Sequence, residues 1–139
     1  MKMKDQEISL DFESNIQFTE FCAFILNFLK INLKINEDDS FKIELGIREA
    51  ISNAIIHGNK SNLKKRVFVK FKWNKKRIVI HVKDENPNKI DINKIKEKIK
   101  KNDILSFRGR GILIMENYMD KVEFLYSENG NEIVMEKMI

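Results

Sequence analysis

Two alternating runs of residues constrain the fold of this chain most strongly. Residues 66–73 (RVFVKFKW) and 77–84 (RIVIHVKD) place β-branched or aromatic side chains at every second position, and only Asn74, Lys75 and Lys76 separate them. Side chains of a β-strand alternate between the two faces of a sheet, so this period indicates strands with one buried face. Two such runs joined by so short a connection predict an antiparallel β-hairpin.

Two helices are predicted before the hairpin. A strand-like run at residues 7–12 comes first, and a helix then extends from Ser14, a residue type that caps helices, to about residue 33. A second helix ends at Gly58, since glycine commonly follows the last helical turn. Three residues are candidates to cap its start: Asp38, Asp39 and Ser40.

The part of the chain after the hairpin predicts two more helices and two more strands. In chain order it holds the loop DENPNKID (84–91), a lysine-rich helix (93–101), the glycine-spaced FRGRG (107–111), a helix ILIMENYM (112–119), and strands KVEFLY (121–126) and EIVMEK (132–137) around a turn at Gly130. Helices segregated against a largely antiparallel sheet make an α+β sandwich. We expect one domain spanning residues 1–139.

Cysteine content and hydropathy indicate a cytoplasmic protein. The only cysteine, Cys22, lies in an apolar stretch, so a disulfide framework is impossible and a reducing compartment is expected. The longest apolar stretch, residues 21–33, is interrupted by Asn27 and Lys30 and falls short of the roughly 20 apolar residues that cross a bilayer. We therefore expect a core helix there and no membrane association.

The net charge of +5 and the pI near 9.2 admit two interpretations. Lysines cluster in KSNLKKR, WNKKR and KIKEKIKK, which is typical either of a surface for nucleic acid or acidic partners or of an ordinary solvated face. A nucleic-acid-binding module normally interleaves aromatic residues with its basic ones on a recognisable scaffold. The solvated face is therefore favoured, with no direct binding of nucleic acid.

A carboxylate and a carboxamide, Glu49 and Asn53, stand four residues apart in the apolar run EAISNAIIHGN (49–59). At about 100° per residue, the helix buries a broad face and leaves this pair at its margin. That face consists of Ile43, Ile47, Ala50, Ile51 and Ala54. A desolvated polar group without a partner costs about 1–3 kcal/mol, so either the fold or a ligand must supply partners. One interpretation is a structural hydrogen bond, and the other is a base beside an amide oxygen suited to Mg²⁺.

Two other positions admit both a functional and a structural interpretation. Asp84 ends a strand, where its carboxylate could accept an amino group of a base or merely cap a turn. The segment Arg108-Gly109-Arg110-Gly111 precedes a predicted helix. Glycines there let backbone N–H groups approach an anion, although such a segment can also be a plain turn.

Taken in order, these segments resemble a known family. A helix with E-x-x-x-N and H-G-N, a strand ending in Asp84 and the segment GRGILIMENYMDKVEF (109–124) are similar to the Bergerat-type ATP-binding fold of the GHKL superfamily, and most of all to its small anti-sigma-factor serine kinases. The N box corresponds to residues 48–59, the G1 box to the loop after Asp84 and the G2 box to residues 109–124. The resemblance extends over nearly the whole chain and implies a two-layer α/β sandwich, with a mostly antiparallel sheet and helices on one face.

The resemblance implies a role for each part of the site. Glu49 would be the general base, Asn53 would bind a Mg²⁺ ion that bridges the ATP phosphates, and Asp84 would accept the adenine amino group. Further nucleotide-contacting positions are implied by the three boxes: His57, Asn86, Asn88, Arg108, Gly109, Arg110 and Gly111. Among these, the glycines would let the chain fold over the phosphates, and the arginines would neutralise charge. His57 is also a residue type that caps or packs a last helical turn.

The implied function is that of an ATP- and Mg²⁺-dependent protein serine kinase. It would phosphorylate an anti-anti-sigma protein of the STAS type, bind a sigma factor, regulate transcription by switching between these partners, and form a homodimer. The G1 loop departs from the family, because Asn86 and Asn88 occupy its two usual glycine places. Asparagine tolerates positive φ best among the other residues, so the loop can still fold. A catalytically weakened nucleotide- or partner-binding module of the same fold therefore remains an alternative, as do a nucleic-acid-binding domain and a histidine-kinase-like catalytic domain.

Overall fold

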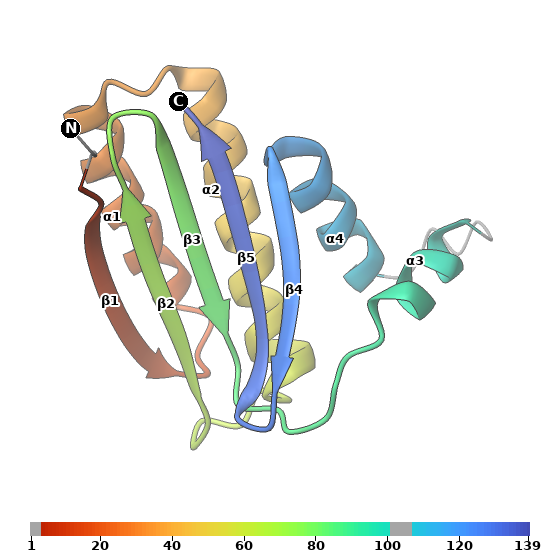
Figure 1. Ribbon diagram of the computed structural model, residues 1–139. Helices are drawn as coiled ribbons and strands as arrows, with labels where there is room; N and C mark the ends of the chain where they lie inside the picture. Colours follow the sequence, from red (N-terminus) through yellow and green to blue (C-terminus); the bar gives the residue numbers. More distant parts are fainter. Residues whose placement is uncertain (1–3, 101–106) are drawn as a thin grey trace.

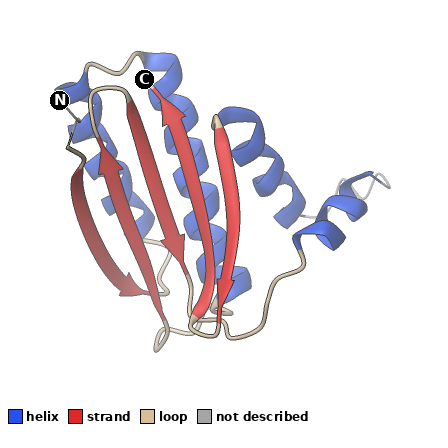
Figure 2. Ribbon diagram, viewed as in Figure 1, coloured by secondary structure: helices blue, strands red, loops and turns tan. Residues whose placement is uncertain are grey.

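The computed structural model describes residues 4–100 and 107–139, and at residues 99, 100 and 107–109 it describes the backbone alone. One sheet is covered on one face by three helices, α1, α2 and α4, while α3 lies beyond the edge of the sheet (Figures 1 and 2). The elements in chain order are β1 (Gln6–Glu13), α1 (Phe18–Leu33), α2 (Glu37–Ser52), a π-helical turn η1 (Asn53–Gly58), β2 (Arg66–Trp73), β3 (Arg77–Lys83), α3 (Ile92–Lys100), α4 (Phe107–Tyr118), β4 (Lys121–Ser127) and β5 (Gly130–Met138). The predicted α+β sandwich is confirmed.

The five strands are antiparallel throughout and follow the order β1-β2-β3-β5-β4. The predicted hairpin is β2–β3, and its register pairs Phe71 with Ile80 on the helix-covered face. β5 lies between β3 and β4, and Lys83 at the end of β3 pairs with Glu132 near the start of β5. This order brings the loop after β3 and the β4–β5 turn to the same end of the sheet.

The core lies between the inner face of the sheet and the three covering helices. All five residues of the predicted apolar face, four on α2 and Ala54 in η1, are buried, as are Cys22 of α1 and Met115 of α4. On the sheet, the buried residues of β2 and β3 alternate along each strand: Val67, Val69, Phe71, Ile78, Ile80 and Val82. Within the described ranges, no helix is both long and apolar enough to cross a bilayer.

Both predicted helix starts were wrong. α1 begins at Phe18 after Gln17, which makes no side-chain cap, whereas Ser14 donates its hydroxyl to the Lys65 carbonyl at 2.6 Å and so joins β1 to the start of β2. α2 is capped by Asn36, whose Oδ1 accepts the Asp39 N–H at 2.8 Å. Asparagine satisfies an unpaired helical N–H as well as aspartate or serine does, so residue type alone does not choose among adjacent candidates.

The end of α2 also differs from the prediction. The helix passes into η1, and the Asn59 N–H donates to the Ala54 carbonyl at 2.8 Å, five residues back. Gly58 does not adopt the left-handed conformation; the positive φ values of 55° and 56° belong to Lys60 and Ser61. Turns of π-helix are rare and frequently lie at functional sites, because they change which side chains face a pocket.

The segment 107–111 was predicted to precede a helix, but the structure places it inside α4. The first turns of α4 lie against α2, and a Cβ atom at Gly111 would lie only 2.5 Å from Glu49 Oε2. The glycine therefore serves close helix–helix approach in this conformation. The side chain of Arg108 lies outside the described part of the structure, and Gly109 is described by its helical backbone alone.

Candidate functional site

Glu49 and Asn53 lie where α2 passes into the π-helical turn. Asn53 is 8% exposed and Glu49 is half-buried, as expected for the margin of the core. Within the part of the chain that the structure describes, neither the Glu49 carboxylate nor the Asn53 amide makes a side-chain hydrogen bond. The structural hydrogen bond considered for this pair is therefore not formed by the described residues.

The environment of Glu49 favours a proton acceptor of increased basicity. Burial raises the pKa of its carboxyl group above the usual value, and the positive charge of Arg110 on α4 opposes that rise in pKa. Gly111 packs against the same carboxylate, and a Cβ there would lie 3.5 Å from Asn53 Nδ2. Arg110 is exposed, and its charge acts on Glu49 from the neighbouring helix.

Asp84 is buried at the end of β3, with 4% of its surface exposed. Its Oδ1 accepts the backbone N–H groups of Asn86 and Asn131, each at 2.9 Å. Gly58 and Gly130 lie so close that a Cβ atom on either would overlap Asp84, and Gly130 has a φ of 149°. These two N–H groups and the close packing of both glycines fix the orientation of the Asp84 carboxylate.

The loop after Asp84 folds without the positive φ that was expected of Asn86 and Asn88. Among the described residues, only Lys34, Lys60 and Ser61 combine a positive φ with a side chain. The loop instead forms successive turns closed by side chains: Asp84 Oδ1 accepts the Asn86 N–H, and Asn86 Oδ1 accepts the Asn88 N–H at 2.9 Å. Such turns are common for Asp and Asn, and they replace glycine here at the level of the backbone.

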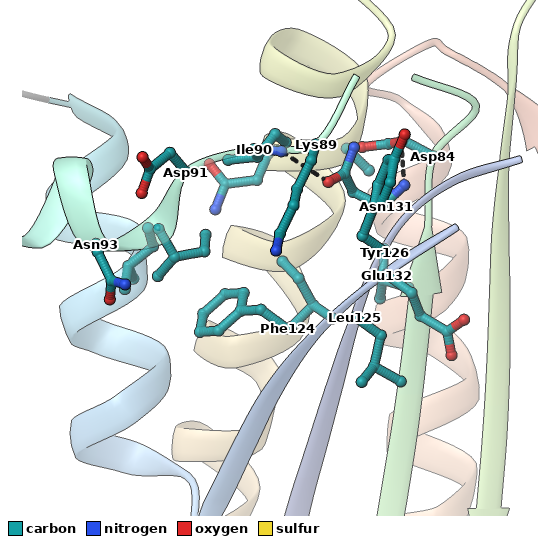
Figure 3. Close-up of a pocket in the computed structure, with 16 residues that line it drawn as sticks. Asp84, Lys89, Ile90, Asp91, Asn93, Phe124, Leu125, Tyr126, Asn131 and Glu132 are labelled. Carbon is teal, nitrogen blue, oxygen red and sulfur yellow. Dashed lines mark hydrogen bonds between the residues drawn. The ribbon is translucent and has the colours of Figure 1, made fainter. Parts of the chain in front are cut away.

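A pocket of about 740 Å³ opens between the π-helical turn, this loop, the start of α3, α4 and the β4–β5 pair (Figure 3). Its size is within the range of ordinary ligand pockets. The lining residues are Asn53, Ala54, Val82, Asp84, Lys89, Ile90, Asp91, Ile92, Asn93, Ile112, Phe124, Leu125, Tyr126, Asn131, Glu132 and Ile133. Apolar and polar side chains contribute equally in number to this lining, so the pocket offers a ligand both apolar contact and hydrogen-bonding groups.

The pocket brings together some of the predicted site residues and not others. Asn53 and Asp84, which come from separate elements, both line it. Glu49 lies one helical turn before Asn53 and contacts Gly111 at the start of α4. Outside residues 107–109, six predicted residues are not among those that line the pocket: Glu49, His57, Asn86, Asn88, Arg110 and Gly111.

Sequence reasoning missed Lys89, Tyr126 and Asn131 of the pocket wall. The Asn131 side chain contacts the loop through three hydrogen bonds, and the Tyr126 hydroxyl donates to the Pro87 carbonyl. No local signal could have found them, because a polar residue at the start of a strand and a tyrosine near a strand end are ordinary.

Two proteins are similar to this chain in sequence over nearly its whole length. The anti-sigma F factor of Oceanobacillus iheyensis is 28% identical over 135 residues, covering 96% of this chain and 92% of that protein. The anti-sigma F factor of Bacillus thuringiensis is 25% identical over the same length and with the same coverage.

A solved structure has the same fold. The crystal structure of the RsbU and RsbW domains of Rv1364c from Mycobacterium tuberculosis matches with a TM-score of 0.68 at 12% identity. The match covers 96% of this chain and 32% of that longer one. The family described as "Histidine kinase-like ATPase domain" matches residues 13–137. With the Asn53 and Asp84 side chains converging on one pocket of that fold, the chain belongs to the histidine kinase-like ATPase domain family, as a GHKL protein of the anti-sigma-factor kinase group.

Proposed function

We propose that this chain is an ATP-binding anti-sigma factor that phosphorylates a serine on an antagonist protein. The observation that carries the proposal is the Glu49–Asn53 pair. Both side chains lack hydrogen-bond partners within the described chain, and they stand beside a pocket that also holds the buried carboxylate of Asp84. Polar groups left without partners at the margin of a core fit a ligand better than a purely structural role.

Each side chain has a distinct part in phosphoryl transfer. Asp84 accepts a hydrogen bond from the adenine amino group, which orients ATP in the pocket. Asn53 offers an amide oxygen that would hold Mg²⁺, an ion that prefers oxygen ligands and neutralises charge on the phosphates. Glu49 takes the proton of the serine hydroxyl as the serine oxygen attacks the γ-phosphorus, and the bond from that phosphorus to the bridging oxygen breaks to release ADP.

The raised pKa of Glu49 suits this role. A base must be ionised at working pH and must bind a proton strongly enough to drive the transfer. Burial raises the pKa of this carboxyl group and the charge of Arg110 opposes that rise, so the net upward shift makes the carboxylate more basic than an exposed glutamate.

The proposed partners are an anti-anti-sigma protein of the STAS type and a sigma factor. Support comes from relatives that match over nearly their whole length and are named anti-sigma F factors. A homodimer is supported by an apolar outer face of α1, where Phe21, Phe24, Phe28 and Ile31 are all more than half exposed. Sedimentation of the wild type and of Phe24→Glu tests this dimer. If the two proteins have the same mass in solution, the outer face of α1 is not the dimer interface.

A binding module with weakened catalysis is the second candidate. The specific observation in its favour is the contact between Gly111 and the Glu49 carboxylate, because the first turns of α4 cover part of the proposed base. A module of this kind would bind its partner equally well with or without the carboxylate of Glu49.

Calorimetric titration with ATP, with and without Mg²⁺, tests the proposal in the wild type and in Asn53→Ala. We expect Mg²⁺-dependent binding that Asn53→Ala weakens strongly. Transfer of labelled γ-phosphate to a purified STAS-domain protein from the same organism then compares the wild type with Glu49→Gln. Retained ATP binding with lost transfer in Glu49→Gln identifies the base, whereas undiminished transfer would refute that assignment.

A further inference from the structure

The side-chain amide of Asn131 brackets one residue of the loop, Lys89. Asn131 Nδ2 donates to the Asn88 carbonyl at 2.9 Å, and Asn131 Oδ1 accepts the Ile90 N–H at 3.0 Å. The same Nδ2 also lies 3.3 Å from the Asn86 carbonyl. Hydrogen bonds on both sides of one residue restrict its backbone in the way that a neighbouring strand would. Asn131 therefore restrains the backbone on both sides of Lys89.

Asn131 is itself held firmly in the sheet. Its backbone N–H donates to Asp84 Oδ1 at 2.9 Å, and its carbonyl accepts the Asp84 N–H at 3.0 Å. The Tyr126 hydroxyl donates a hydrogen bond to the Pro87 carbonyl and so anchors the loop at a second point. The loop that lacks glycines is therefore anchored to the β4–β5 pair in addition to the turns that its own side chains close.

Lys89 extends into the pocket from this bracketed position (Figure 3). It is the only cation among the described lining residues, and within the described chain its ammonium makes no hydrogen bond or ion pair.

The three acidic lining residues already have other partners. Asp84 accepts the two N–H groups described above, Asp91 accepts the Lys94 N–H at 3.1 Å, and Glu132 pairs with His81 Nδ1 at 2.7 Å. Within the described chain, none of these three carboxylates therefore forms an ion pair with the Lys89 ammonium.

We propose that Lys89 binds the phosphate chain of the nucleotide in this pocket and that Asn131 is its positioning residue. The inference rests on the proposed nucleotide binding. A nucleoside triphosphate brings several negative charges toward three carboxylates, and an ammonium in the same pocket offsets that repulsion and donates charge-assisted hydrogen bonds. Lysine acts as a flexible point charge, so the position of its backbone decides where that charge is available.

A phosphate series tests the role of Lys89. ATP, ADP, AMP and adenosine are titrated against the wild type, Lys89→Ala, Lys89→Arg and the control Lys75→Ala, which removes an exposed lysine from the β2–β3 turn. For Lys89→Ala we expect about tenfold or greater loss of ATP affinity, a smaller loss as phosphates are removed and none for adenosine. Lys89→Arg should retain most of the affinity, and Lys75→Ala should match the wild type. Unchanged ATP binding by Lys89→Ala, or an equal loss for adenosine, would overturn the assignment.

A double-mutant cycle tests the positioning role of Asn131. Asn131→Ala and Asn131→Asp are compared with Asn129→Ala, a control in the same turn whose side chain is exposed and makes no hydrogen bond in the described chain. Asn131→Asp keeps the acceptor for the Ile90 N–H and loses the donor to the Asn88 carbonyl. Both Asn131 variants should weaken ATP binding. Each should cause a smaller loss of ATP affinity in the Lys89→Ala background than in the wild-type background. Strictly additive losses in folded variants, checked by circular dichroism, would refute the coupling.

The wild-type titrations separate this inference from the proposed function. Folded wild-type protein that binds neither ATP nor adenosine would refute both. Wild-type protein that binds ATP as tightly as Lys89→Ala does would refute the role of Lys89 alone.

Discussion

Gly58 packs against Asp84, a residue that lines the pocket, with no space for a side chain between them. The carboxylate is buried, receives two backbone N–H groups and packs against the π-helical turn. At the scale of single residues, the site therefore depends on steric room as much as on the identity of its polar groups.

Gly58→Ala is expected to lower the free energy of unfolding by about 1–3 kcal/mol, because its Cβ would overlap the Asp84 carboxylate. The matched control is Gly46→Ala on α2, where a Cβ would meet the flexible Met119 sulfur at 3.3 Å. There the higher helix propensity of alanine, worth about 1 kcal/mol, offsets the crowding. Urea unfolding measures both variants, and equal effects would contradict the packing argument.

Glu49→Gln is expected to be more stable than the wild type at neutral pH. Because burial raises the pKa of Glu49 in the folded state, the folded protein binds this proton more tightly than the unfolded chain does. The stability that the group contributes is fully present below its unfolded pKa, near 4.5, and is lost as pH rises through the higher folded pKa. Melting curves between about pH 4 and pH 8 should show the gap between the two proteins widening with pH. If the stability difference between Glu49→Gln and the wild type instead narrows as the pH rises, the pKa of Glu49 is not raised in the folded state.

At the scale of elements, the path of α2 decides which side chains reach the pocket. The helix begins at a side-chain cap, buries one face against the sheet, and widens into a π-helical turn at Asn53. Asn59 ends this region with 1% exposure and donates its side-chain amide to the Ser14 hydroxyl and the Arg66 carbonyl at 2.9 and 3.0 Å. Its Oδ1 accepts the Glu85 N–H at 2.8 Å, so it also joins this helix to the loop after Asp84.

Asn36→Ala is expected to cost about 1 kcal/mol of stability, because it removes the acceptor of the Asp39 N–H at the start of α2. Ser40→Ala, at a position that the sequence also suggests as a cap, should change the free energy of unfolding by less than about 0.5 kcal/mol. Chemical denaturation of both variants distinguishes the two. A larger loss of stability in Ser40→Ala than in Asn36→Ala would show that Asn36 is not the residue that caps the helix.

At the scale of the whole molecule, sheet order assembles the site. Because β5 lies beside β3, Asp84 and Asn131 are hydrogen-bonded although they are 47 positions apart in the chain. Ala54 of the π-helical turn and Ile112 of α4 line the pocket from the helical layer. In the ribbon, α3 extends beyond the sheet edge (Figure 1).

Cys22 reports on the integrity of this whole arrangement. Cys22 lies on α1 and is fully buried in the core, and desolvation raises the pKa of its thiol to about 12. A thiol reagent that requires the thiolate should therefore react only through unfolding, at a rate that increases with urea in parallel with loss of circular dichroism. Rapid labelling in native buffer would mean that α1 opens locally.

The sequence by itself determined the hairpin, the buried face of α2 and the stripe that holds Glu49 and Asn53, because hydrophobic period is a local property of consecutive residues. It also indicated the family through the order of its motifs. Cap positions were wrong because several adjacent residues could satisfy the same N–H groups.

Only the tertiary structure decided that residues 107–111 are helical against Glu49, and that Asn131 anchors the loop and restrains the backbone on both sides of Lys89. These contacts join residues far apart in the chain. They depend on which strands are neighbours and on how closely two helices approach, and no local pattern encodes either.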